Sequence, residues 1–224
     1  MTRQLKLRIH SVKCVDETGG KYFEKLGNDE IYLSGFTIDG EGRTTKIPAF
    51  NIYSNFDDGE VKKYDPPHTF TTFTVSDTKN WPKDFGVCFL LFERDSGDMN
   101  EALDMAYQKF KEEVDSKMAS AKSSDKNSFA IPWEIIFSTI IPMVARYLQS
   151  IIASAISDDP FPLESVSLNL PGENFNWGGS NTSPIDKVEF RGNDGVYYLF
   201  YDWELIGKNE GWFDLPKERD HRTS

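Results

Sequence analysis

The sequence predicts a mainly β protein, an antiparallel β-sandwich that carries a two-helix insertion. Segments near both ends of the chain alternate apolar and polar side chains, which is the period of a half-buried strand. One segment, residues 85–93, is apolar throughout, as expected for a central strand buried on both faces. Between residues 99 and 157 the apolar period becomes that of a helix, so helices interrupt the β-structure.

The first strand is predicted at residues 5–15, where Leu5, Leu7, Ile9 and Val12 approximate a period of two. Further strands are predicted at 31–38, 47–53, 69–75, 163–170 and 186–190, at the apolar run 85–93 and at the aromatic-rich segment 195–206. The segment 172–184 is rich in Gly, Asn and Ser, which predicts a long loop.

The insertion is predicted to contain two helices. Asp98 stands in a capping position, and apolar residues follow at helical spacing up to Met118. A polar loop at 122–128 leads to a second helix at 131–156, with a kink expected at Pro142.

The apolar stripe of the second helix has two interpretations, contact with a membrane or partner, and packing against the first helix and the sandwich. Its polar face lacks the Lys and Arg residues of most interfacial helices, which favours packing. If the stripe is a contact surface, its residues are Trp133, Ile136, Phe137, Ile140 and Ile141.

Composition limits the partners. The formal net charge is −11, which argues against nucleic acid as a direct partner. Contact with anionic lipid would need calcium or a local basic patch to overcome the same repulsion. Cys14 and Cys88 each lie in an apolar strand-like run, so they form either one disulfide or two buried thiols.

We expect no catalytic activity, because the chain shows no nucleophile motif, no phosphate-binding loop and no zinc spacing. Two acids could still pair across the fold for glycoside-type chemistry, a question that spacing does not decide. The N-terminal residues contain no apolar signal-peptide region, and no clean transmembrane segment is seen. The expected location is the cytoplasm, or the exterior after export without a leader.

Acidic residues cluster at the ends of the predicted strands. Carboxylates from distant segments can converge at one end of a sandwich, where they repel each other unless a cation neutralises them. Hard oxygen ligands of this kind suit calcium. The alternative is that these acids simply cap turns in solvent. The candidate calcium ligands are Asp16, Asp29, Glu93, Asp95, Asp158 and Asp159.

The order of these features resembles a C2 domain over residues 4–98 and 158–207. In that family an early strand ends in Asp, a second Asp begins the next strand, and a later apolar strand ends in a D-x-D-like element. The chain departs from the pattern at Glu30, where the family usually has Pro, and at Glu93, where it has Asp. The helical segment 99–157 falls inside what would be the third calcium loop.

The resemblance implies one C2-like domain over residues 1–224 with the helical hairpin 99–157 inserted in it. The implied function is a calcium-dependent binding module that engages a membrane surface, an anionic lipid or a protein partner. One variant makes it part of a leaderless toxin or membrane-acting effector. The alternative is a non-catalytic structural or assembly protein whose sandwich binds no metal.

Overall fold

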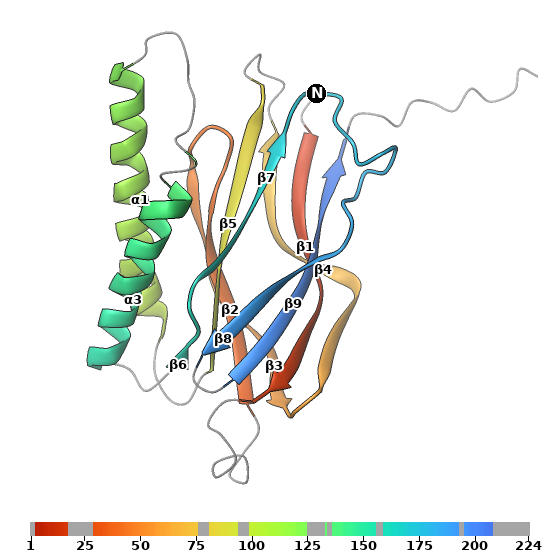
Figure 1. Cartoon of the computed structure of the whole chain (residues 1–224), viewed down its shortest axis with the longest axis vertical. Coiled ribbons are helices and arrows are strands. Elements are labelled where there is room, and N and C mark those ends of the chain that lie inside the picture. Colours follow the sequence, from red (N-terminus) through yellow and green to blue (C-terminus); the bar gives the residue numbers. More distant parts are fainter. Residues whose placement is uncertain are drawn as a thin grey trace, which may run out of the picture.

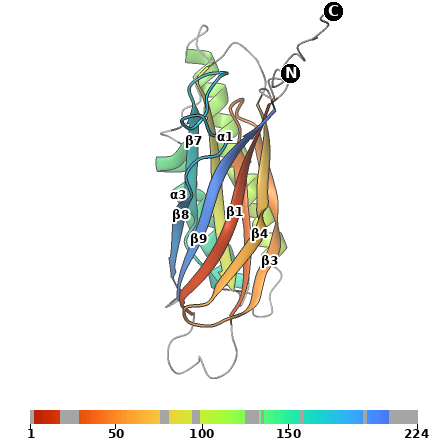
Figure 2. The same ribbon diagram turned by 90° about the vertical axis from the view of Figure 1, so that its right-hand side faces the viewer.

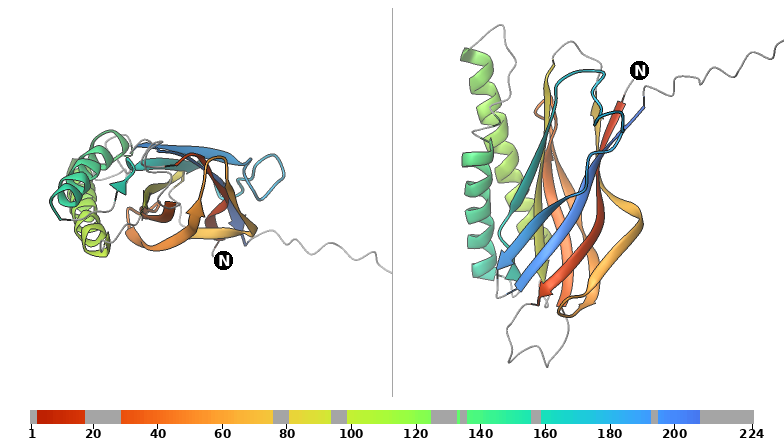
Figure 3. Two further views of the ribbon diagram at one scale, coloured as in Figure 1. Left: turned by 90° about the horizontal axis from the view of Figure 1, so that it is seen from below. Right: turned by 45° about the vertical axis from the view of Figure 1, so that its right-hand side comes forward.

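Two antiparallel sheets face each other, and helices cover the outer face of one of them (Figure 1). This computed structural model describes residues 3–17, 29–75, 81–93, 99–124, 133, 136–155, 159–192 and 195–207. Seen from below, the helices lie to one side of the sandwich (Figure 3). The prediction of a mainly β antiparallel sandwich with a two-helix insertion is confirmed.

The sheet without helices, called the open sheet below, faces the viewer in Figure 2. Its strand order is β4-β1-β9-β8, and all its pairings are antiparallel. The bounds of its strands are Arg3–Asp16 for β1, Val61–Val75 for β4, Asp186–Gly192 for β8 and Gly195–Ile206 for β9.

The second sheet, called the covered sheet, has the order β3-β2-β5, with β6 and then β7 pairing along the free edge of β5. All its pairings are antiparallel as well. Its strands are β2 (Asp29–Ile38), β3 (Thr44–Phe56), β5 (Lys83–Glu93), β6 (Asp159–Pro160) and β7 (Glu164–Leu170).

Strand β4 is longer than the sequence predicted, because it begins at Val61 rather than at residue 69. Pro66 and Pro67 hide its first half from a pattern search, although proline is tolerated on an edge strand such as β4. The register with β1 jumps from Lys63 to His68, so the intervening residues bulge out of the pairing. Strand β6 was not predicted, since two residues show no period.

Strand β5 separates two apolar cores. Alternate residues face the sandwich interior, including Phe89 and Leu91. The residues that alternate with these along the strand, Cys88, Leu90 and Phe92, face the helices. Each of these five side chains is at most 3% exposed, so the prediction of a strand buried on both faces is confirmed.

The insertion forms α1 (Met99–Ser124), a π-helical turn η1 (Ile136–Ile140) and α3 (Ile141–Ala155). Near Pro142, where a kink was predicted, the structure has this π turn, which ends two residues before the proline. Proline donates no hydrogen bond and crowds the carbonyl four residues back, and a widened turn accommodates both effects. In the described part of the chain, no helix has the length and apolar character needed to cross a membrane.

The two cysteines are free thiols in different layers. Cys14 lies in the sandwich core, whereas Cys88 lies in the core beneath the helices. A disulfide requires the two Cβ atoms to be adjacent, which these positions do not allow. Of the two alternatives, a disulfide or two buried thiols, the structure therefore shows two buried thiols. Burial raises the pKa of the Cys88 thiol to about 12, which makes it unreactive while the helices are in place.

Candidate functional site

One end of the sandwich brings together strand termini that carry acids. β1 and β5 end there, and β2 and β6 begin there, at the bottom of Figure 1. Glu93, the last residue of β5, is directly opposite Ile31 of β2 on one side and Asp159 of β6 on the other. Asp29 stands two residues before Ile31. Three predicted ligands therefore occupy neighbouring positions on three adjacent strands, a region called the acidic end below.

The open sheet supplies a fourth acid. Asp16 is the last residue of β1, lies opposite Val196 and is exposed. The predicted ligands Asp95 and Asp158 lie outside the described residues, as do the side chains of Asp29 and Asp159. Among the side chains that the structure does describe, no three of Asp, Glu, His or Cys are grouped so as to hold a metal ion.

The turn between β3 and β4 adds acids that the sequence analysis missed. Asp57 and Asp58 precede Gly59, whose φ of +80° suits a tight turn. The Glu17 backbone N–H donates to Asp58 Oδ1 at 2.9 Å, and the Cys14 N–H donates to the Glu60 carbonyl at 2.9 Å. These bonds tie the end of β1 to the turn. The Asp-Asp-Gly signal between two strands could have identified it.

The proposed contact stripe of the second helix is part of the core in this conformation. Ile136, Ile140 and Ile141 are 0%, 1% and 6% exposed, and Trp133 packs half-buried against the same cluster. The Phe137 side chain lies outside the described residues. The outer face of the covered sheet is itself apolar, and the stripe removes it from water together with the apolar face of α1. The expectation that packing buries the stripe is confirmed.

Helix α1 is fixed to the covered sheet through the β2–β3 turn and the start of β3. Tyr107 Oη donates to the Thr44 carbonyl at 3.0 Å, and Lys46 forms an ion pair with Asp104. Gly42, with φ +82°, lies under Met118, and a Cβ built on Gly42 would be 2.6 Å from the Met118 methyl carbon. The hairpin is thus docked by both polar and steric contacts.

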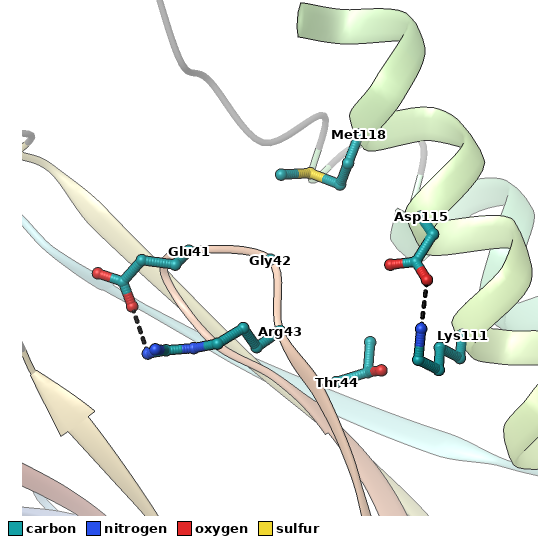
Figure 4. A pocket seen from close by; sticks show the side chains of 7 residues that line it. All are labelled: Glu41, Gly42, Arg43, Thr44, Lys111, Asp115 and Met118. Carbon is teal, nitrogen blue, oxygen red and sulfur yellow. Dashed lines mark hydrogen bonds and ion pairs between the residues drawn. The ribbon is translucent and has the colours of Figure 1, made fainter.

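A cavity of about 390 Å³ lies between this turn and α1 (Figure 4). Its charged side chains are already paired, and Glu41 also bonds Lys83 of β5 at 2.6 Å. Arg43 bonds Glu41 at 2.8 Å, and Lys111 bonds Asp115 at 2.5 Å. Because these charges neutralise each other, the cavity offers no excess charge to a ligand. It lies at the opposite end of the covered sheet from Glu93.

Comparisons with known proteins add little to this geometry. No protein-family model and no curated protein matches the sequence. Among solved structures, a C2 domain protein from Ramazzottius varieornatus is similar, with 10% identity, 93% of this chain and 92% of that chain covered, and a TM-score of 0.31. This is the kind of domain that the order of strands and acids resembles. A likeness of that size carries no functional argument, so the sandwich is assigned from its own strand pairing.

Proposed function

We propose that the protein is a binding module that holds calcium at its acidic end and uses the bound ion to engage an anionic surface. The observation that carries the proposal is the pairing of Glu93 with Asp159, with Asp29 near them on the next strand. Like charges directly opposite on paired strands destabilise a sheet. A cation bound by them converts that repulsion into attraction.

The donor chemistry fits calcium. Calcium takes six to eight oxygen ligands in flexible geometry, and carboxylates from several loops suit it better than they suit softer metals. Asp29, Glu93 and Asp159 would supply oxygens from the covered sheet, and Asp16 from the open sheet. Asp95 and Asp158 adjoin these strands in the sequence and would complete the set. Coordination positions left open on the ion would accept phosphate oxygens of a lipid or carboxylates of a partner.

The helical hairpin is not the first contact in this proposal. Its apolar stripe is buried against the covered sheet, so membrane contact through Ile136 or Ile140 would require the hairpin to leave its core. In the effector variant of the proposal, the hairpin is released after calcium has brought the sandwich to a membrane.

Thermal unfolding in calcium, in magnesium and in chelator tests the calcium site. Calcium at about 100 times its dissociation constant should stabilise the folded chain by roughly 2.7 kcal/mol. Magnesium should have little effect, because it demands near-ideal octahedral geometry. The double variant Asp29→Asn with Asp95→Asn should lose the calcium shift, whereas Glu112→Gln with Glu101→Gln on α1 should keep it.

Sedimentation with vesicles then tests the bridging step. Calcium should increase binding to vesicles that contain phosphatidylserine and leave binding to phosphatidylcholine vesicles unchanged. If wild type melts identically in calcium and chelator, the metal site is refuted. The alternative function, a structural or assembly protein, would then be favoured if the chain self-associates.

A further inference from the structure

Three of the four long edge strands of the sandwich carry features that stop strands of different molecules from pairing. Proteins protect sheet edges with prolines, bulges and charged side chains. Strand β3 contains Pro48, and its register with β2 is irregular. Strand β4 contains Pro66 and Pro67 and bulges out of its pairing with β1. Strand β8 contains Lys187 and Arg191. These three edges are therefore poor partners for another strand.

Strand β7, the remaining edge, has none of these features. Its residues, ESVSLNL, include no proline, lysine or arginine. It pairs with β5 over seven consecutive residues without a register shift. Among the described residues β5 is its only partner strand, so alternate backbone N–H and C=O groups on its other side face no strand. β8 of the open sheet is close to the start of β7 and diverges from it toward Leu170 (Figure 1).

The side chains of β7 form an apolar row and a polar row. Val166 and Leu168 pack against the sandwich core but remain partly exposed, and Leu170 is buried in that core. Ser167 and Asn169 are exposed on the opposite face of the strand. The apolar row thus lies at the margin of the core, where one more strand would remove it from water.

From these observations we infer that β7 pairs with β7 of a second copy of this chain, antiparallel and about a two-fold axis at Ser167. A two-fold contact requires a surface that is complementary to itself. The register centred on Ser167 aligns all seven residues of both strands. Pro162 and Pro171 flank the strand, and because proline donates no hydrogen bond to a ladder they limit slippage to other registers.

This pairing is complementary in side-chain type. Val166 lies opposite Leu168 of the second copy, and Ser165 lies opposite Asn169 of the second copy. The Asn169 amide N–H donates to Asp84 Oδ1 at 2.7 Å, which leaves the Asn169 carbonyl oxygen available to accept from the Ser165 hydroxyl. Apolar pairs and hydrogen-bonding pairs directly opposite each other are the contacts that stabilise neighbouring strands.

The pairing is also compatible in charge. Glu164 is the one ionisable side chain of β7, and it lies opposite Leu170 of the second copy, so like charges do not meet. Strand β8 shows the contrast. Pairing β8 with itself about its central residue would set Glu189 opposite Glu189 and Lys187 opposite Arg191. Charge therefore permits self-pairing at β7 and opposes it at β8.

The expected dimer is reversible, because two seven-residue strands form a small interface. Antiparallel pairing places the acidic ends of the two copies at opposite ends of the dimer, since β6 and the start of β7 lie toward that end in each copy. The inference goes beyond the proposed calcium site and does not rest on it.

Sedimentation velocity of the full chain in chelator tests the inference over a range of protein concentrations. Physiological ionic strength screens the repulsion between two chains of net charge −11. The average mass of wild type should rise from monomer toward dimer as the concentration increases. Ser167→Lys sets two like charges opposite each other at the axis and should weaken dimerisation roughly tenfold. The matched control is Thr45→Lys, an equal charge change at an exposed position of β3, and it should dimerise as wild type does.

A charge-swap mixture tests the axis itself. Ser167→Glu alone should weaken dimerisation as Ser167→Lys does. An equimolar mixture of the two variants should recover it, because the axis then sets Lys opposite Glu. Misfolding of either variant cannot produce this recovery. Three results would overturn the inference: a wild type that stays monomeric at every concentration, equal loss in Ser167→Lys and Thr45→Lys, or no recovery in the mixture.

Calcium-induced thermal stabilisation, measured on the same proteins, separates this inference from the proposed function. Ser167→Lys should keep the calcium shift, because the axis lies outside the acidic end. Absence of the shift in a wild type that dimerises would refute only the calcium site. Its presence in a wild type that stays monomeric would refute only the dimer.

Discussion

Glu93 and Asp159 are directly opposite each other where β5 pairs with β6, at the end of the sandwich where Asp29 begins β2. The fold brings these two acids together although they lie 66 positions apart in the sequence. Most of the intervening chain is the helical insertion, which leaves from the end of β5 and returns at β6. The insertion and the acidic end therefore share one attachment point.

Asp159→Asn should stabilise the protein in chelator and weaken its response to calcium. A carboxylate directly opposite another costs up to about 1 kcal/mol, and the amide removes that repulsion. Urea unfolding in chelator and in calcium measures both effects. Glu112→Gln on the exposed face of α1 makes the same change in charge and should alter neither. A loss of stability in chelator would mean that Asp159 is not repelled at its position.

Gly42→Ala should cost more stability than Gly59→Ala. Both glycines have φ near +80°, so the backbone strain of an alanine is similar, about 1 kcal/mol at each. A Cβ on Gly42 would also be 2.6 Å from the Met118 methyl carbon, whereas a Cβ on Gly59 has no neighbour within 4 Å among the described atoms. We expect about 1 kcal/mol more for Gly42→Ala, since Met118 must shift.

Urea midpoints of the two single variants measure that difference. Adding Met118→Ala should reduce the excess cost of Gly42→Ala, because it removes the side chain that the new Cβ meets. Equal costs at the two glycines would show that α1 does not rest on the β2–β3 turn as described.

Ile140→Asp should detach or destabilise the helical hairpin. Ile140 is 1% exposed, and an unpaired charge at that position should cost roughly 3 to 5 kcal/mol. Alkylation of Cys88 reports the change, because its thiol lies beneath the helices with its pKa raised to about 12. Labelling should be faster in the variant than in wild type.

Ser138→Asp is the matched control, since Ser138 is exposed on the same π turn and the substitution should cost less than about 0.5 kcal/mol. If Ile140→Asp leaves both the unfolding midpoint and Cys88 labelling unchanged, Ile140 is not part of a core. A selective loss of membrane binding in that case would make the stripe a contact surface.

The free energy of unfolding should decrease as the pH falls below about 6.5, because His68 is partly buried in its neutral form. Burial lowers the pKa of His68 from its ordinary value of 6.5, and its ring packs 4.7 Å from Phe50 and 5.4 Å from Tyr64. Between the folded and unfolded pKa values, the unfolded chain binds more protons, so stability rises with pH across that window. His68→Phe should flatten this part of the stability curve, and equal slopes for variant and wild type would contradict it.

Local periodicity determined much of the fold. Strand and helix segments follow from alternation at Leu5, Leu7 and Ile9 and from helical spacing along α1, because these patterns depend on side chains that lie within one element. The apolar run of β5 also predicted burial on both faces. The same local patterns placed acids such as Asp16 and Glu93 at strand ends.

Tertiary structure decided which residues meet. Periodicity carries no information on register, so only the fold shows that Glu93 faces Asp159 and that Lys13 faces Tyr198. For the same reason, the sequence did not show that the Asp57–Asp58 turn lies beside β1, or to which layer each cysteine belongs. The stripe of the second helix reads the same in sequence whether it faces water or protein. Its burial was decided by α1 and by the apolar outer face of the covered sheet, which only the assembled fold brings together.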